Sequence, residues 1–200
     1  MIRRVAWLAA TALGLFAGGF VLHFPGSFGE PDWQPAAMIF GFILGFLTGV
    51  AVGLLQWAAL LLPKGPGSRL ALAMGVGIGV THAFFDGAPG SVGRTFVAIV
   101  SALAMTTAFA LILRERRPAA LAVCFAGWTG GLLVAAAVTS TLGMPWSETP
   151  VGWSMEHAVQ GLIAGLIWGA ATGWIGLPDM LSRPGEIPSG SGEGRPASAS

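Results

Sequence analysis

The stretch Gly41-Phe-Ile-Leu-Gly45-Phe-Leu-Thr-Gly49-Val-Ala-Val-Gly53 places a glycine at every fourth position of a long apolar segment. Four residues are close to one turn of an α-helix, so the glycines form a strip without side chains along one helix face. In water such a helix is poor, because each glycine costs about 1 kcal/mol relative to alanine. In a bilayer the strip lets a second helix approach at backbone distance. The stretch therefore predicts a membrane helix packed closely against a neighbour.

The same spacing returns near the end of the chain, where four further glycines are Gly161, Gly165, Gly169 and Gly173. Apolar residues make up 54% of the sequence and charged residues only 10%, against about 25% charged in ordinary soluble domains. We therefore expect an all-α, polytopic integral membrane bundle with glycine-zipper packing, surrounded by the lipid bilayer. No basic strip alternates with aromatic residues, so nucleic acid is not an expected partner.

Six apolar segments approach the roughly 20 residues that a helix needs to cross a bilayer. The expected spans are 5–24, 36–62, 70–88, 96–113, 119–142 and 157–177. Pro and Gly mark the short connections between them. These spans make residues 1–181 one transmembrane domain. Residues 182–200 are rich in Ser, Gly and Pro, which predicts a disordered cytoplasmic tail.

The basic residues predict the orientation of the spans. With six spans, all basic residues except Arg94 fall on one side of the membrane, namely Arg3, Arg4, Lys64, Arg69, Arg114, Arg116, Arg117, Arg183 and Arg195. Lys and Arg are enriched in cytoplasmic loops. The pattern therefore predicts a multi-pass protein of the inner (cytoplasmic) membrane with both termini in the cytoplasm.

The segment Gly49-Val-Ala-Val-Gly53-Leu-Leu-Gln56-Trp57-Ala-Ala-Leu60 resembles a Gly-x-x-x-Gly-x-x-Gln-Trp-x-x-Leu pattern of small bacterial multi-pass membrane proteins. The resemblance covers one span and implies a bacterial integral membrane protein, without implying an activity. The equivalent part of the last span, Thr172-Gly173-Trp174-Ile175, lacks the glutamine.

An internal repeat is a further hypothesis. The first two spans resemble the last two, with Gly18-Gly19 matching Gly130-Gly131 ahead of each glycine strip. Both pairs run in the same direction, as in the parallel repeats of some transporters. The alternative is that glycine-rich helices resemble each other by composition alone.

Ionisable residues near the expected outer face form the candidate site. His82 and Asp86 are four residues apart, so they share a helix face if the third span continues that far, and Glu156 and His157 open the last span. Neutral imidazole and carboxylate groups bind divalent transition metals or relay protons. These four residues form a candidate metal or proton site. The alternative is that they are helix-end residues that meet water and lipid headgroups.

Gln56 is the strongest hydrogen-bonding group deep within a span. We expect it to serve helix packing by bonding to another helix, and the alternative is a contact to a substrate. The tryptophans near the expected boundaries predict an aromatic belt. Those assigned to the inner boundary are Trp7 and Trp57, and those assigned to the outer one are Trp33, Trp146 and Trp153.

Three functions follow from these features. The first, and the one the sequence favours, is a non-enzymatic membrane scaffold or assembly component that uses its glycine strips internally or to form a homo-oligomer. The second is a small transporter or channel for a neutral or apolar solute, since the middles of the spans lack charge. The third is an outer-face protein that handles metal ions or protons. Neither His-Glu-x-x-His nor Cys-x-x-Cys occurs, so we expect no enzyme and no cofactor.

Overall fold

The computed structural model describes residues 1–23, 34–60, 67–85, 90–142 and 150–176. This part of the chain is helical and contains no strand, which confirms the all-α prediction. Its six helices are α1 (Ile2–His23), α2 (Gln34–Ala59), α3 (Gly67–Phe85), α4 (Gly90–Ile112), α5 (Pro118–Leu142) and α6 (Pro150–Trp174). Each overlaps one expected span. The predicted tail, residues 182–200, lies outside the described residues.

Three of the described helices are long and apolar enough to cross a membrane. They are Met38–Ala59 within α2, Val92–Ile112 within α4, and Pro118–Leu142, which is α5. Large apolar side chains on the outside of the bundle are compatible with lipid contact, for example Ile39, Ile43, Leu47, Phe96 and Leu103. These features are those of a membrane protein with three candidate spans.

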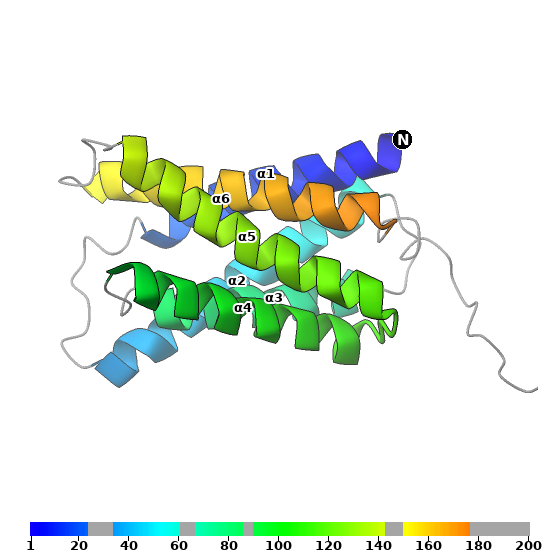
Figure 1. The fold of residues 1–200 in the computed structure, drawn as a ribbon, viewed down its shortest axis with the longest axis horizontal. Helices are drawn as coiled ribbons and strands as arrows, with labels where there is room; N and C mark the ends of the chain where they lie inside the picture. The colour runs from blue at the N-terminus through cyan, green and yellow to red at the C-terminus, as the bar shows by residue number, and fades with distance from the viewer. Residues whose placement is uncertain (24–33, 61–66, 86–89, 143–149, 177–200) are drawn as a thin grey trace, which may run out of the picture.

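The six helices form a closed ring. Each helix contacts the next one along the chain, and α6 returns to contact α1. The most extensive contacts join α2 to α3 and α1 to α6. Figure 1 shows α1 and α6 near each other along one edge of the bundle, with α5 crossing the view diagonally. The two ends of the described chain are thus packed together.

The first glycine strip faces α3. A Cβ atom on Gly45 would lie 2.8 Å from the carbonyl oxygen of Ile78, which is too close for any real side chain. From each glycine to the next, the facing residue of α3 lies about one turn earlier in the sequence. The pairs are Gly41 with His82, Gly45 with Ile78, Gly49 with Met74 and Gly53 with Ala71. The two antiparallel helices therefore touch through their backbones along about three turns.

The second strip faces α1. A Cβ atom on Gly165 would lie 2.8 Å from Cα of Ala12, and one on Gly161 would collide with the carbonyl oxygen of Leu15. At Gly173 the nearest atom, Cδ1 of Trp7, is 3.7 Å away, an ordinary contact distance. The α6 strip is therefore closely packed over its first part and looser at its last glycine.

The glycine pairs of the hypothetical repeat have different surroundings. A Cβ atom on Gly18 would collide with Cγ2 of Thr48 in α2, whereas one on Gly130 would meet nothing within 4 Å. Gly131 does lie close to a neighbour, with Ala164 O 3.0 Å from its notional Cβ. The two glycine pairs therefore match in sequence, but Gly18 is closely packed and Gly130 is not.

Aromatic residues fill the centre of the bundle. The ring of Trp168 lies 6.1 Å from that of Trp7, 5.6 Å from that of Phe109 and 5.6 Å from that of Trp128, measured between centroids. Trp7 and Trp168 are both 0% exposed. This aromatic cluster stabilises the packing of α1, α4, α5 and α6.

The aromatic-belt prediction is wrong for Trp7, which lies in the core because Thr172 provides a buried partner for its indole N–H. Trp57 is partly buried and packs against the same core. Trp33 and Trp146 lie outside the described residues, as does the side chain of Trp153.

Candidate functional site

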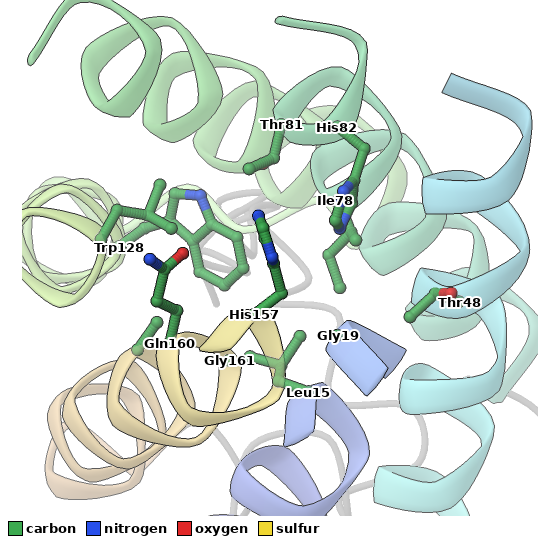
Figure 2. Close-up of a pocket in the computed structure, with 12 residues that line it drawn as sticks. Leu15, Gly19, Thr48, Ile78, Thr81, His82, Trp128, His157, Gln160 and Gly161 are labelled. Carbon is green, nitrogen blue, oxygen red and sulfur yellow. The ribbon is translucent and has the colours of Figure 1, made fainter. Parts of the chain in front are cut away.

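A cavity of about 60 Å³ lies between five of the helices (Figure 2). This volume is room for about four water molecules. Its lining residues are Leu15 and Gly19 from α1, Thr48 from α2, Ile78, Thr81 and His82 from α3, Trp128 and Leu132 from α5, and His157, Gln160, Gly161 and Ala164 from α6. The lining is mostly apolar with a few polar groups, as is usual for small-molecule sites.

Glycines shape one wall of the cavity. Gly19 and Gly161 bring α1 and α6 to backbone distance, and a Cβ atom on Gly19 would collide with the carbonyl oxygen of His157. This close approach fixes the backbone from which the His157 side chain projects. The glycine strip thus positions a candidate functional residue as well as packing two helices.

The lining has a polar end and an apolar end. On α3, Thr81 and His82 lie about one turn closer to the end of the helix than Ile78. On α6, His157 lies nearly two turns closer to the start of the helix than Ala164. Thr81, His82 and His157 therefore lie toward the end of the bundle where α3 ends and α6 begins.

The structure brings two of the four predicted metal ligands together. His82 and His157 come from α3 and α6, and Figure 2 shows both imidazoles projecting into the pocket. Glu156 does not line the pocket, and its carboxylate accepts a hydrogen bond from Gln160 Nε2 at 3.3 Å. Asp86 lies outside the described residues. Among the described residues, no group of three or more His, Cys, Asp or Glu is arranged to hold a metal ion.

The donors of two polar lining residues are already engaged. The Thr81 hydroxyl donates to the carbonyl oxygen of Gly77 at 2.9 Å. Gln160 Nε2 donates to Thr139 Oγ1 at 2.9 Å as well as to Glu156. In Figure 2 the Gln160 amide oxygen lies on the pocket side and the nitrogen is turned away. These two residues therefore have no hydrogen left to donate, whereas the indole N–H of Trp128, which also lines the pocket, is buried without a partner among the described residues.

A layer of buried hydrogen bonds lies one turn or more beyond the pocket. Gln56 Nε2 donates to Thr11 Oγ1 at 2.7 Å, which joins α2 to α1. The Thr11 hydroxyl in turn donates to the carbonyl oxygen of Trp7 at 2.7 Å. Gln56 Oε1 is buried and accepts no hydrogen bond from the described residues. The side chain thus makes a contact between helices and keeps one unused acceptor.

Sequence reasoning missed Thr11, Thr172 and Gln160. A signal for the first two is present in the chain, since Trp7 and Thr11 have the same spacing as Trp168 and Thr172. Each threonine donates to the carbonyl oxygen of the tryptophan one turn earlier, both at 2.7 Å. The repeated Trp-x-x-x-Thr spacing marks two helices that meet in the core.

The connection between α4 and α5 holds a buried carboxylate. Glu115 accepts hydrogen bonds from the Arg117 backbone N at 2.8 Å, and from Nε and Nη2 of the same residue at 3.1 Å each. Burial by itself raises the pKa of Glu115, but the hydrogen bonds and charge of Arg117 outweigh it and hold the pKa below its usual value. Arg114 precedes this turn with a φ of 57°. The pair orders the entry to α5.

The chain matches no protein-family model, no curated protein and no solved structure at a significant level. The resemblance of residues 49–60 to small bacterial membrane proteins therefore stays a prediction. The pocket and the helices that enclose it are the features from which a function can be inferred.

Proposed function

We propose that the protein is a small transporter or channel for a neutral solute, which it binds in the pocket between the helices. In this proposal all six helices cross the inner membrane, both termini are cytoplasmic, and the polar end of the pocket faces outward. The supporting observation is the pocket itself, a cavity lined by five helices around His82 and His157. Ligand sites between the helices of a bundle are common.

The lining favours a neutral solute. No Asp, Glu, Lys or Arg is among the described residues that line the pocket. An ion stripped of water needs opposite charge or a full set of polar ligands, and a mostly apolar cavity supplies neither. A small neutral molecule meets no such penalty. This agrees with the shortage of charge in the middles of the expected spans.

One argument for the scaffold hypothesis was that the glycine strips could join two copies of the protein, and this argument is weakened. Both glycine strips face helices of the same chain, with Gly45 against Ile78 and Gly165 against Ala12. They are therefore not exposed for contact with a second copy. A homo-oligomer stays a prediction that needs another surface, and the pocket makes transport the better supported function.

Solute entry into proteoliposomes tests the proposal. Stopped-flow light scattering would follow the uptake of urea, acetamide and glycerol by vesicles with and without the protein. We expect at least one solute to enter faster with the protein. Thr81→Trp fills the pocket and should abolish the acceleration, whereas Thr107→Trp, on the exposed face of α4, should keep it. Equal rates with and without protein for all three solutes would contradict the proposal.

A further inference from the structure

We infer that the pocket binds a short primary amide, a molecule that carries one carbonyl oxygen and an NH₂ group on a small carbon body. The inference rests on the proposed function and names the solute class for the same pocket. It follows from one hydrogen-bond donor and two acceptors that three different helices contribute to the lining.

The donor is the indole N–H of Trp128 on α5. Trp128 lines the pocket and is only 2% exposed, and its Nε1 has no hydrogen-bond partner among the described residues. Figure 2 shows its ring projecting from α5 into the space between α3 and α6. An indole N–H only donates, so a ligand without an acceptor would leave it unpaired in the filled pocket. Because an unpaired buried donor is costly, the ligand carries an acceptor oxygen.

The acceptors are the side-chain oxygens of Thr81 on α3 and Gln160 on α6. The hydroxyl hydrogen of Thr81 is committed to Gly77 O at 2.9 Å. Both Nε2 hydrogens of Gln160 are committed, one to Thr139 and one to Glu156. Each side chain therefore keeps only oxygen lone pairs for a ligand, and these pair with a hydrogen that the ligand donates.

The number of these groups decides between classes of neutral solute. A primary amide has one carbonyl oxygen for Trp128 and two N–H hydrogens for Thr81 and Gln160. An alcohol has one hydroxyl hydrogen and cannot donate to both oxygens, and a ketone donates to neither. His82 and His157 already have interactions of their own, and the match does not need them.

The apolar part of the lining limits the carbon body. Leu15, Ile78, Leu132 and Ala164 contribute hydrocarbon surface from four helices. The cavity of about 60 Å³ is smaller than the roughly 150 Å³ that accommodates benzene in an engineered apolar cavity. The ligand is therefore smaller than benzene, which fits an amide of the size of acetamide.

Binding of acetamide and acetone tests this class, because the two probes have nearly the same shape and only the amide donates hydrogen bonds. The protein would be held in nanodiscs of deuterated lipid. Titrations followed by saturation-transfer NMR give a dissociation constant for each probe. We expect acetamide to bind more tightly than acetone, because acetone leaves Thr81 and Gln160 unpaired.

Two variants separate the donor from the acceptors. Trp128→Phe keeps an aromatic ring and removes the N–H, so it should weaken the binding of both probes about fivefold, the factor expected for one net hydrogen bond. Thr81→Val removes an acceptor, so it should weaken acetamide by a similar factor without weakening acetone. The matched control is Trp57→Phe, which also removes a buried, unpartnered indole N–H but lies outside the pocket lining. It should keep the parent affinities.

The outcomes separate the two proposals. If acetone binds as tightly as acetamide and both lose binding in the pocket-filling variant Thr81→Trp, the pocket binds solutes but the amide class is wrong. An acetamide affinity that is unchanged in Trp128→Phe or in Thr81→Val also overturns the amide class. If neither probe binds above the Thr81→Trp background, both the amide class and solute binding in this pocket are overturned.

Discussion

Trp7 and Thr172 are 165 residues apart in sequence, yet the indole Nε1 of Trp7 donates to Thr172 Oγ1 at 3.0 Å in the core. The Thr172 hydroxyl donates to the Trp168 carbonyl oxygen, and Gln56 joins the same layer through Thr11. Each of these residues lies one turn or more beyond the pocket residues of its own helix. The layer thus closes the bundle on the side away from the histidines.

The bond between Gln56 and Thr11 predicts unequal effects of two substitutions. Thr11→Val leaves the fully buried Nε2 of Gln56 unpaired and should lower the free energy of unfolding by about 1–3 kcal/mol. Gln56→Leu removes the whole amide, including its unpartnered Oε1, and should cost less. Adding Gln56→Leu to Thr11→Val should restore part of the loss. Unfolding in mixed micelles measures all three, and a larger loss in Gln56→Leu alone would contradict this account.

The glycine strips predict a contrast between packed and open positions. A methyl group on Gly45 would lie 2.8 Å from Ile78 O, so Gly45→Ala should force α2 and α3 apart at a cost of about 1–3 kcal/mol. Gly130 meets nothing within 4 Å, so Gly130→Ala should be neutral or stabilise the helix by up to about 1 kcal/mol. Thermal melts in detergent compare the two, and equal shifts in Tm would show that the strip is not closely packed.

The Glu115–Arg117 pair predicts a pH dependence. Because folding lowers the pKa of Glu115, the ionised carboxylate stabilises the folded state. This contribution is complete above the ordinary value of 4.5 and is lost as the pH falls through the lowered pKa. Arg117 is about half exposed, so Glu115→Gln should cost only about 1 kcal/mol at pH 7. The difference in the free energy of unfolding between Glu115→Gln and the parent should shrink below pH 4.5. A difference that stays constant down to pH 3 would contradict this prediction.

The metal hypothesis has its own test. If His82 and His157 hold a divalent ion, Zn²⁺ should raise the Tm of the parent by several degrees and a chelator should reverse the effect. The double variant His82→Ala, His157→Ala should not respond. A parent whose Tm is the same with Zn²⁺ and with chelator ends this hypothesis and leaves the histidines as pocket lining.

The sequence predicted where the helices lie better than it predicted which helices contact each other. Glycine spacing and the length of the apolar segments are local features of the chain, so an all-helical chain was foreseeable from the six apolar segments. Which helix faces a strip is a tertiary property, and nothing near Gly161 in sequence indicates Leu15. The ring closure between α1 and α6 was therefore not foreseeable from the sequence.

The candidate site was only partly foreseeable, because contacts between helices decide which residues meet in it. His82 and His157 stood out because ionisable residues are rare in this chain. Trp7 was misplaced because a tryptophan near a helix end fits both an aromatic belt and a core, and only its partner Thr172 decides. Gln160 gave no signal of its own, since its role depends on hydrogen bonds to Thr139 and Glu156.

Cysteine accessibility tests the central proposal, that the pocket lies within a membrane bundle and opens to the outer face. In a Cys124→Ala background, His82→Cys places a thiol at the polar end and Gln56→Cys places one in the buried layer. Intact cells would be treated with a small membrane-impermeant thiol reagent. The account predicts rapid labelling of His82→Cys and none of Gln56→Cys. Labelling of His82→Cys only after the cells are broken open would contradict it.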